Sequence, residues 1–243
     1  MRILVMSDIH ANYPALEAVL KDAGAVDETW CLGDLVGYGP DPNAVVEEVR
    51  EIKNLTCLMG NHDVAVIGKM SLETFNGDAK RSLMYHEQVL SASNMDFIKS
   101  LPTKPKARNG ATIVHGSPRD PLWEYILNST TASLNFDHFE TDWCFVGHTH
   151  IQSIFTLKNG TDRVAAEYAK PDTALTLRPR LILNPGSVGQ PRDRDPRAAY
   201  AIYDSTALTW TPKRVAYNFA EVQERIRAAG LPEKHAVRIA EGW

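Results

Sequence analysis

The chain has 243 residues, of which 44% are hydrophobic and 23% charged, a balance typical of globular proteins and not of disordered chains. Its formal net charge of −4 argues against binding to nucleic acid or membranes through overall positive charge. We find no apolar run of the ~20 residues that span a membrane and no signal peptide. Cys31, Cys57 and Cys144 lie in or beside apolar runs, which favours buried thiols in a reducing compartment. We therefore expect a soluble cytoplasmic protein.

Strands and helices alternate in the first part of the chain. Residues 2–6 form a continuous apolar run, which is typical of a strand buried on both faces. In residues 14–23 the apolar side chains recur at the spacing of an amphipathic helix, and Gly24 follows as a stop signal. The pattern repeats with a strand at 28–32, a helix at 43–52 and a strand at 55–59. This order predicts a parallel sheet with right-handed crossovers and helices packed against it.

The alternation is interrupted by residues 64–110, which we interpret as an inserted helical segment with helices at about 78–90 and 93–100. The alternation then resumes with a strand at 111–114, a helical stretch at roughly 129–139 and a strand at 142–146. No change of composition marks a linker. We therefore expect a single domain spanning residues 1–243, with the helical insertion at about 64–110.

After residue 150 the pattern changes to short segments of alternating hydrophobicity. Strands are predicted at 151–157, 163–169, 180–184, 198–203 and 206–211. Their close spacing predicts a second, more antiparallel sheet. A final helix is predicted at about 218–229, before the stop signal Gly230-Leu231-Pro232.

Residues able to bind a metal follow five of the predicted strands. They are Asp8 and His10 after the first strand, Asp34 after the second, Asn61, His62 and Asp63 after the third, His115 after the strand at 111–114, and His148 and His150 after the strand at 142–146. Each of these short motifs on its own is a common turn. Because ligands bind at the carboxyl ends of the strands of an open α/β sheet, the five together predict a metal site at one edge of one sheet.

The residue types indicate which metals would bind. A mixed set of imidazoles and carboxylates suits manganese, iron, zinc or nickel, whereas a site built only of oxygen ligands suits magnesium or calcium. Two cations held ~3.5–4 Å apart need an anionic ligand between them to offset their repulsion, and a carboxylate provides one.

This series of motifs resembles that of the calcineurin-like metallophosphoesterase superfamily, in which D-x-H, G-D-x-x-G, G-N-H-[DE], H and G-H-x-H follow in this order. Here the motifs are Asp8-Ile9-His10, Gly33-Asp34-Leu35-Val36-Gly37, Gly60-Asn61-His62-Asp63, His115 and Gly147-His148-Thr149-His150. The opening residues 7–12 and the run 184–189 are similar to the small YfcE-like phosphoesterases of bacteria and archaea. The resemblance implies an α/β fold, a four-layer α/β/β/α sandwich of two mixed sheets.

The resemblance also implies a role for each residue. Asp34 would bridge two divalent transition-metal ions, manganese first, with iron, zinc or nickel as alternatives. Asp8, His10 and His150 would complete the first metal site, and Asn61, His115 and His148 the second. A metal-bridging hydroxide would attack phosphorus in line. His62 would stabilise charge and protonate the leaving oxygen, with Asp63 orienting its ring.

Two further positions have two interpretations each. Asn12 either donates a hydrogen bond to a substrate phosphate or caps the helix that begins near Pro14. Arg192 either clamps a phosphate or belongs to a solvated loop in which Asp193 and Asp195 pair with the neighbouring arginines.

We therefore expect a dinuclear metal-dependent phosphoesterase that hydrolyses a small phosphodiester or phosphomonoester, with nucleotides among the candidate substrates. One alternative is a catalytically silent metal-binding scaffold that acts through protein interaction, and the complete set of motifs, His62 included, argues against it. A nuclease acting on DNA ends is another, and the acidic charge balance argues against a nucleic-acid substrate. We expect no membrane partner, and the sequence leaves open whether the chain forms a homo-oligomer.

Overall fold

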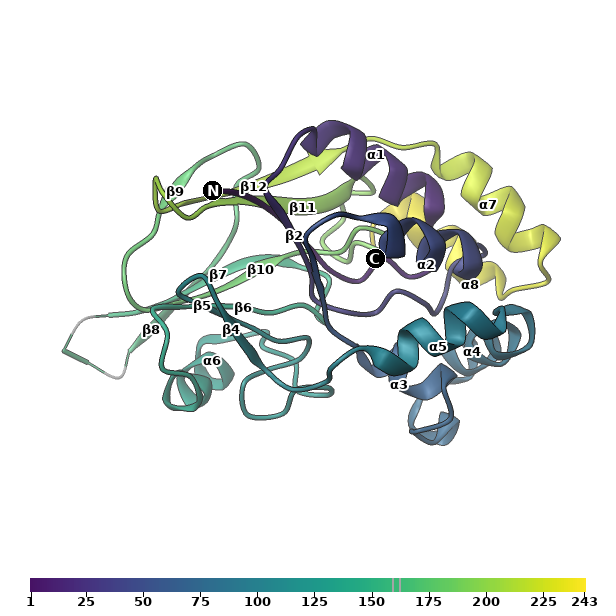
Figure 1. Ribbon diagram of the computed structural model, residues 1–243, viewed down its shortest axis with the longest axis horizontal. Coiled ribbons are helices and arrows are strands. Elements are labelled where there is room, and N and C mark those ends of the chain that lie inside the picture. Colours follow the sequence, from purple (N-terminus) through teal and green to yellow (C-terminus); the bar gives the residue numbers. More distant parts are fainter. Residues whose placement is uncertain (159, 162) are drawn as a thin grey trace.

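Two six-stranded sheets lie face to face in the computed structural model, which describes residues 1–158, 160–161 and 163–243 (Figure 1). Helices flank the pair of sheets on both outer sides. Both sheets contain parallel and antiparallel neighbours. The expected α/β/β/α sandwich of two mixed sheets is therefore confirmed.

The first sheet combines strands from both ends of the chain. Its order is β3 (Leu55–Cys57), β2 (Glu28–Cys31), β1 (Arg2–Met6), β11 (Ala198–Asp204), β12 (Thr209–Val215) and β9 (Leu175–Thr176). As the alternation of strands and helices predicts, β1, β2 and β3 are parallel. In contrast, β11 pairs with β1 in antiparallel register, with Leu4 opposite Ile202.

The second sheet is built from the middle of the chain. Its order is β4 (Lys106–Arg108), β5 (Ala111–Ile113), β6 (Trp143–Phe145), β10 (Leu181–Pro185), β7 (Gln152–Leu157) and β8 (Val164–Tyr168). The neighbours β5, β6 and β10 are parallel, and β4, β7 and β8 extend the sheet in antiparallel fashion.

This pairing corrects one prediction. The strands after residue 150 do not form a sheet of their own, because β9, β11 and β12 join the first sheet and β7, β8 and β10 join the second. Alternating hydrophobicity marks a strand with one buried face, but it does not encode the partner. The antiparallel character predicted for this part of the chain is nevertheless present in both sheets.

Large apolar side chains fill the space between the two sheets. Trp30 of β2 and Tyr203 of β11 come from the first sheet, and Phe145 of β6 comes from the second. The ring centroids of these buried side chains lie 5.3 to 5.8 Å apart. Contacts of this kind add to the stabilisation that comes from burial. The shared core fixes the two sheets, and therefore the loops at their ends, relative to one another.

The helices cover the outer faces of the sandwich (Figure 1). They are α1 (Tyr13–Ala23), α2 (Pro42–Glu51), α3 (Asn61–Val66), α4 (Gly77–Val89), α5 (Ala92–Ser100), α6 (Ser129–Asn135), α7 (Phe219–Ala228) and α8 (Glu233–Glu241), with short 3-10 turns η1 (Leu72–Thr74) and η2 (Phe136–His138). α1 and α2 pack on the first sheet and α6 on the second. Within the described residues, no helix combines the length and the apolar composition needed to cross a membrane.

The helices of the inserted segment, α4 and α5, lie where they were predicted, whereas α8 was missed. The sequence Gly230-Leu231-Pro232 predicts the end of the helical region. In the structure, Pro232 occupies the N-cap position of a further helix. Ala236 and Ile239 of α8 pack against Val222 and Ile226 of α7. The helix therefore owes its place to tertiary packing, which a short C-terminal pattern does not reveal.

Candidate metal centre

The five loops that carry the predicted ligands meet at one end of the sandwich, but they come from both sheets. The loops after β1, β2 and β3 belong to the first sheet, and those after β5 and β6 belong to the second. The two sets are joined directly, since the backbone N–H of His148 donates to Asp8 Oδ2 at 3.0 Å. The expectation of one edge of one sheet is therefore wrong. Two sheets packed face to face bring the ends of both sets of parallel strands together.

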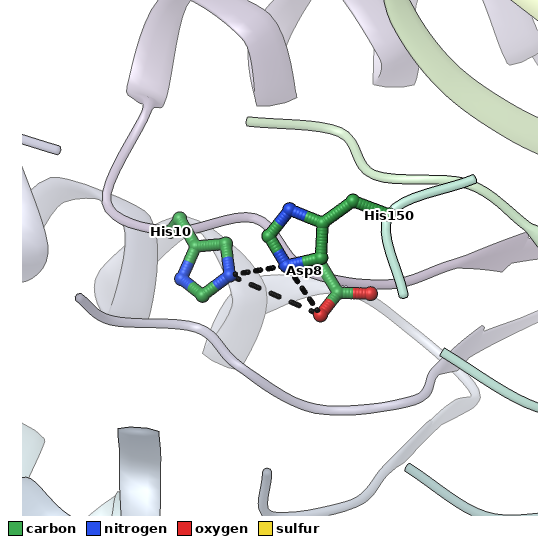
Figure 2. A group of neighbouring side chains, drawn as sticks. All are labelled: Asp8, His10 and His150. Atoms are coloured by element: carbon green, nitrogen blue, oxygen red, sulfur yellow. Dashed lines mark hydrogen bonds and ion pairs between the residues drawn. The ribbon is translucent and has the colours of Figure 1, made fainter. Parts of the chain in front are cut away.

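Asp8, His10 and His150 form one group of candidate ligands (Figure 2). His150 Nε2 lies 3.3 Å from Asp8 Oδ1, and His10 Nε2 lies 3.9 Å from the same oxygen. The two Nε2 atoms are 3.1 Å apart. All three side chains are buried. Three atoms with metal-binding capacity therefore converge on one point.

Asp34 lies between this group and a second one. Its Oδ2 is 3.6 Å from His10 Nε2 and 3.4 Å from His115 Nε2. Asp34, His115 and His148 offer ligand atoms that all lie within 4.8 Å of one another. The carbonyl oxygen of Asn61, Oδ1, lies 3.1 Å from His115 Nε2. A single carboxylate oxygen is thus shared by two adjacent sets of donors.

Three of the histidines are oriented by the main chain. Their Nδ1 atoms donate to backbone carbonyls, in the pairs His10 with Val36 (2.8 Å), His115 with Leu32 (3.1 Å) and His150 with Gln190 (2.6 Å). Because a carbonyl only accepts, each Nδ1 must carry the proton. Each Nε2 of a neutral ring then presents its lone pair to the centre, which is the form of imidazole that binds metals.

Burial keeps most of these histidines uncharged. It lowers the pKa values of His10 and His148 well below 6.5, and that of His150 below 6.5. Burial alone would also lower the pKa of His115, but the Asp34 carboxylate outweighs it and raises that pKa to about 9. A cation entering the second group would therefore compete with the proton on His115.

Backbone strain is concentrated in the loops of the centre. Five of the candidate ligands have φ between 49° and 64°, in the left-handed region, namely Asp8, His10, Asp34, His148 and His150. Residues other than glycine rarely adopt this backbone conformation, which persists only where the surrounding structure fixes it. Strain of this kind clusters at functional sites.

Two glycines of the motifs make room for side chains of the centre. A Cβ atom at Gly60 would lie 2.1 Å from Asp34 Oδ1, and one at Gly37 would lie 2.3 Å from His62 Nδ1. Gly37 also has φ of +93°, which strains any other residue. These positions need glycine because the ligand side chains occupy the space where a side chain would stand.

Three buried polar atoms in the centre lack a hydrogen-bond partner among the residues that the structure describes. They are Asp8 Oδ1, Asp34 Oδ2 and His148 Nε2. Buried polar atoms are normally paired, so each of them calls for an explanation. All three atoms carry lone pairs, and divalent cations bound in the two groups would satisfy them. The donor set of imidazole nitrogens and carboxylate oxygens therefore fits transition-metal ions.

His62 stands at the edge of the centre. Its backbone N–H donates to Asp34 Oδ1 at 2.9 Å, and a ring nitrogen lies within 4.8 Å of ligand atoms of His10 and Asp34. Burial, followed by the neighbouring His10, lowers the pKa of His62 well below 6.5. Its Nδ1 is buried and has no partner in the described part of the chain. One nitrogen of the buried His62 ring is therefore unpaired within the described structure, beside Gly37.

Asp63 has a different role from the predicted one. Its Oδ1 accepts hydrogen bonds from the backbone N–H groups of Leu35 and Val36, and its Oδ2 accepts one from Gly60. Asp63 therefore fixes the loop after β2, and the expectation that it orients the His62 ring is wrong. As the third residue of α3, it directs its carboxylate back toward the helix N-terminus. Burial and the Asp34 charge raise its pKa to about 7.

Asn12 caps a helix, as one of its two interpretations predicts. Its Oδ1 accepts from the backbone N–H of Ala15 at 3.2 Å, at the start of α1. Its Nδ2 donates to the Gly189 carbonyl at 2.9 Å and to the Tyr217 hydroxyl at 3.3 Å. Both N–H groups of the amide have acceptors, so the alternative role as a phosphate donor is not supported.

Arg192 faces the centre, whereas the neighbouring acidic residues form ion pairs with other arginines. Its Nη2 donates to the Tyr38 hydroxyl at 3.3 Å and to Gln190 Oε1 at 3.2 Å. The positive charge of Arg192 contributes to the lowered pKa values of His10 and His62. The pairing predicted within this loop is present for Asp195, which binds Arg197, whereas Asp193 binds Arg214 of β12, outside the loop. That pairing leaves Arg192 out.

An aromatic cluster that the sequence did not predict lies against the rings of His62 and His148. Phe75 lies 4.9 Å from the His62 ring, and Trp123 lies 5.2 Å from Phe75. Tyr125 stacks on His148 with ring centroids 3.9 Å apart. Phe75 lies between the 3-10 turn η1 and α4, and Trp123 and Tyr125 lie in the loop after β5, where no periodic pattern marks them. The one feature of the sequence that could have indicated these residues is their position in loops close to the ligand motifs.

The loop that carries Tyr38 is held by α4. The Tyr38 N–H donates to Ser82 Oγ at 3.0 Å, and the Gly37 N–H donates to His86 Nδ1 at 2.9 Å. On its other side, His86 Nε2 donates to the Gly39 carbonyl at 2.8 Å. His86 is therefore a buried residue that holds this loop in place.

Comparison with known proteins agrees with this geometry over the whole chain. The sequence profile of the calcineurin-like phosphoesterase superfamily domain matches residues 1–207. An uncharacterised protein of Methanocaldococcus jannaschii is 35% identical over 238 residues, which are 95% of this chain and 94% of that protein. The crystal structure of a metallophosphoesterase from Sphaerobacter thermophilus is 46% identical and superposes with a TM-score of 0.92, covering 100% of this chain and 99% of that one.

A shorter match joins the chain to symmetrical bis(5'-nucleosyl)-tetraphosphatases. The protein from Buchnera aphidicola subsp. Schizaphis graminum is 30% identical over 105 residues, which are 42% of this chain and only 37% of that protein. The assignment to a family rests on the profile match and the two full-length similarities, and not on this partial match. The chain belongs to the calcineurin-like phosphoesterase superfamily.

Proposed function

We propose that the protein is a dinuclear metal-dependent phosphoesterase that hydrolyses phosphodiester or phosphomonoester bonds in small substrates. The observation that carries the proposal is the position of Asp34 Oδ2, which lies 3.6 Å from His10 Nε2 and 3.4 Å from His115 Nε2. Each of these histidines belongs to a separate group of candidate ligands. A shared carboxylate oxygen between two donor sets is what a pair of cations requires.

The residues that would hold the two ions follow from the two groups. Asp8, His10 and His150 would hold one ion, Asn61, His115 and His148 the other, and Asp34 both. When bound, two such ions would supply charge to stabilise the phosphoryl oxygens and acidify a water molecule. Manganese is our first candidate, with iron, zinc and nickel as alternatives that the same donors suit.

His62 is the proposed general acid. In the free site its pKa is lowered by burial and by His10, so the ring is neutral at neutral pH. A phosphoester carries negative charge, and an adjacent negative charge favours the protonated imidazole. We expect His62 to take up a proton as the substrate binds and to transfer it to the leaving oxygen. The position of its ring, with a nitrogen within 4.8 Å of ligand atoms of His10 and Asp34, supports this role.

Arg192 is the proposed substrate-binding cation. Its guanidinium is held by the Tyr38 hydroxyl and Gln190 Oε1, neither of which neutralises its charge. Its Nε is buried and without a partner within the described residues. A guanidinium with unused N–H groups beside a metal centre suits the oxygens of a phosphoryl group.

The substrate is proposed to be a small molecule, with nucleotides as the first class to examine. The partial similarity to the symmetrical bis(5'-nucleosyl)-tetraphosphatases supports this choice. We further propose a cytoplasmic location, which is supported by the three buried cysteines Cys31, Cys57 and Cys144, all of them free thiols.

Chelation followed by metal readdition tests the proposal. Protein treated exhaustively with a chelator should lose hydrolysis of p-nitrophenyl phosphate and of bis(p-nitrophenyl) phosphate. Readdition of Mn²⁺, Zn²⁺, Ni²⁺ or Fe²⁺ should restore at least one of the two activities as metal content approaches two ions per chain. Hydrolysis that survives chelation, or that needs a single ion per chain, would overturn the proposal.

A further inference from the structure

A hollow of about 390 Å³ opens beside the metal centre on the outer face of the second sheet. Its volume falls in the ~300–1,000 Å³ range of small-molecule sites. Its lining includes the apolar side chains of Ile126, Leu127 and Ile151, the Tyr168 ring, the hydroxyls of Thr149 and Ser153, and the acidic residue Glu167. Thr149, which lines the hollow, lies between the candidate ligands His148 and His150 in the sequence, so the hollow adjoins the loop that carries them.

The floor of the hollow is the part of the sheet that α6 leaves uncovered. Ser153 and Phe155 of β7 alternate with their neighbours, so their side chains lie on one face, and Ile151 directly precedes the strand. Tyr168 of β8 lies opposite Ser153 in the ladder. α6 packs over Phe155 through Ala132 and leaves the end of the sheet nearest the metal centre open.

The side chains around the hollow combine exposed apolar surface with an unused hydroxyl. Tyr125 is 41% exposed, Leu127 56% and Tyr168 79%, and the row begins where Tyr125 stacks on His148. Exposed large apolar side chains grouped in this way mark binding surfaces. Ser153 is only 7% exposed, and its Oγ has no hydrogen-bond partner among the described residues. An unpaired buried hydroxyl in a hollow lined mostly by apolar side chains calls for a polar ligand atom.

We propose that this hollow binds the base of a nucleoside phosphoester whose phosphate lies at the metal centre, an inference that rests on the proposed function. A base offers flat faces that stack on Tyr168 and pack against Leu127, and a polar edge that reaches Ser153 Oγ. The sugar spans the step past Thr149 from the phosphate to the hollow. An alkyl ester would leave Ser153 unpaired and the Tyr168 ring in water.

Two substrates with the same leaving group test the proposal. Thymidine 5'-(p-nitrophenyl phosphate) and methyl p-nitrophenyl phosphate both release p-nitrophenolate from a diester and differ in the group retained. We expect a lower KM for the thymidine ester in the unchanged protein. Tyr168→Ala should raise that KM roughly 5- to 100-fold, the loss expected for one stacked base, and leave the KM of the methyl ester within about twofold. Ser153→Ala should act in the same direction.

Two variants serve as controls. Tyr168→Phe keeps the ring and should keep the preference, and Met84→Ala removes an exposed side chain of α4 (44% exposed) far from the hollow and should change neither KM. Equal KM values for the two esters in the unchanged protein would overturn the hollow as a base site. A Tyr168→Ala effect of equal size on both esters would do the same, while the proposed hydrolysis would stand.

A binding measurement keeps the two proposals separate. Calorimetric titration with thymidine 5'-phosphate and with 2-deoxyribose 5-phosphate, in the presence of a chelator, reports the hollow without turnover. We expect tighter binding of the nucleotide, reduced in Tyr168→Ala and retained in Tyr168→Phe. Equal affinity for the two ligands contradicts the base site. Absence of hydrolysis with every metal, alongside a clear nucleotide preference, would instead remove the proposed function.

Discussion

At the scale of single residues, one carboxylate oxygen connects the two halves of the centre. Asp34 Oδ2 reaches toward His10 on one side and His115 on the other, while Asp34 Oδ1 is held by the His62 N–H. One oxygen is therefore positioned by the protein and the other is left unpaired. The oxygen that the backbone holds is therefore Oδ1, and the oxygen available to metal ions is Oδ2.

The first prediction concerns Asp34→Asn. A neutral amide cannot offset the repulsion of two cations, so we expect the variant to bind at most one ion per chain and to lose at least ~10²-fold in kcat/KM. Metal content by plasma mass spectrometry and hydrolysis of an aryl phosphoester measure this. Asp96→Asn, at an exposed position of α5, is the matched control and should change neither. Two ions with normal turnover in Asp34→Asn would contradict the assignment.

A second residue-level prediction separates His62 from the ligands. If His62 donates a proton, His62→Ala should keep both ions and lose ~10²–10⁴-fold in kcat, the usual contribution of a general acid. The loss should be smaller for substrates with a more acidic leaving alcohol, because these need less protonation. Loss of one ion in His62→Ala would instead make the side chain a ligand, in line with its proximity to His10 and Asp34.

At the scale of elements, the turn between each strand and the next helix sets the position of its ligand. After β3 the chain enters α3 directly, and the Asp63 carboxylate accepts hydrogen bonds from the loop after β2 and from Gly60. The two loops are therefore fixed to each other before any metal binds. The space for the Asp34 carboxylate exists because residue 60 has no side chain.

Gly60→Ala tests the fit of these two turns. The new Cβ would lie 2.1 Å from Asp34 Oδ1 and 2.5 Å from the Asp34 nitrogen, so the turn must move. We expect a loss of roughly 1–3 kcal/mol in stability, a fall of several degrees in Tm, and weaker metal binding. Gly77→Ala is the control, since a Cβ there meets no atom within 4 Å. Equal Tm and metal content in both variants would count against the described packing.

At the scale of the whole molecule, buried histidines outside the centre make stability depend on pH. Burial lowers the pKa values of His86 and His235 from 6.5 to about 4 in the folded protein. Between pH 6.5 and 4, His86 and His235 are protonated in the unfolded chain but remain neutral in the folded protein. The contribution of these groups is therefore complete above pH 6.5 and is lost as the pH falls toward 4.

We expect the free energy of unfolding, measured with urea at several pH values, to fall between pH 6.5 and 4 in the unchanged protein. Replacing both residues, as His86→Gln with His235→Gln, should make that fall smaller, because the added proton uptake of the unfolded chain is gone. His138→Gln alters an exposed histidine and should leave the slope as it is. An identical slope in the double variant and the unchanged protein would show that the two groups do not carry the effect.

Local signals in the sequence predicted the parallel strands and helices of the first part of the chain, whereas the two-sheet sandwich and the role of each residue of the centre followed from the resemblance to the family. Apolar runs and helical spacing mark β1, α1 and α4, and metal-capable residues such as His10 and His115 follow strands directly. What the sequence did not predict depends on distant contacts. The mixing of the two sheets, the packing of α8 on α7 and the hydrogen bonds of Asp63 all require partners that no local pattern names.

The central claim is that two cations lie on either side of Asp34, and anomalous diffraction from a crystal grown with Mn²⁺ tests it most directly. We predict two anomalous peaks ~3.5–4 Å apart, one bound by Asp8, His10 and His150 and the other by Asn61, His115 and His148, with Asp34 Oδ2 between them. A single peak, or peaks elsewhere with these side chains unligated, would contradict the account.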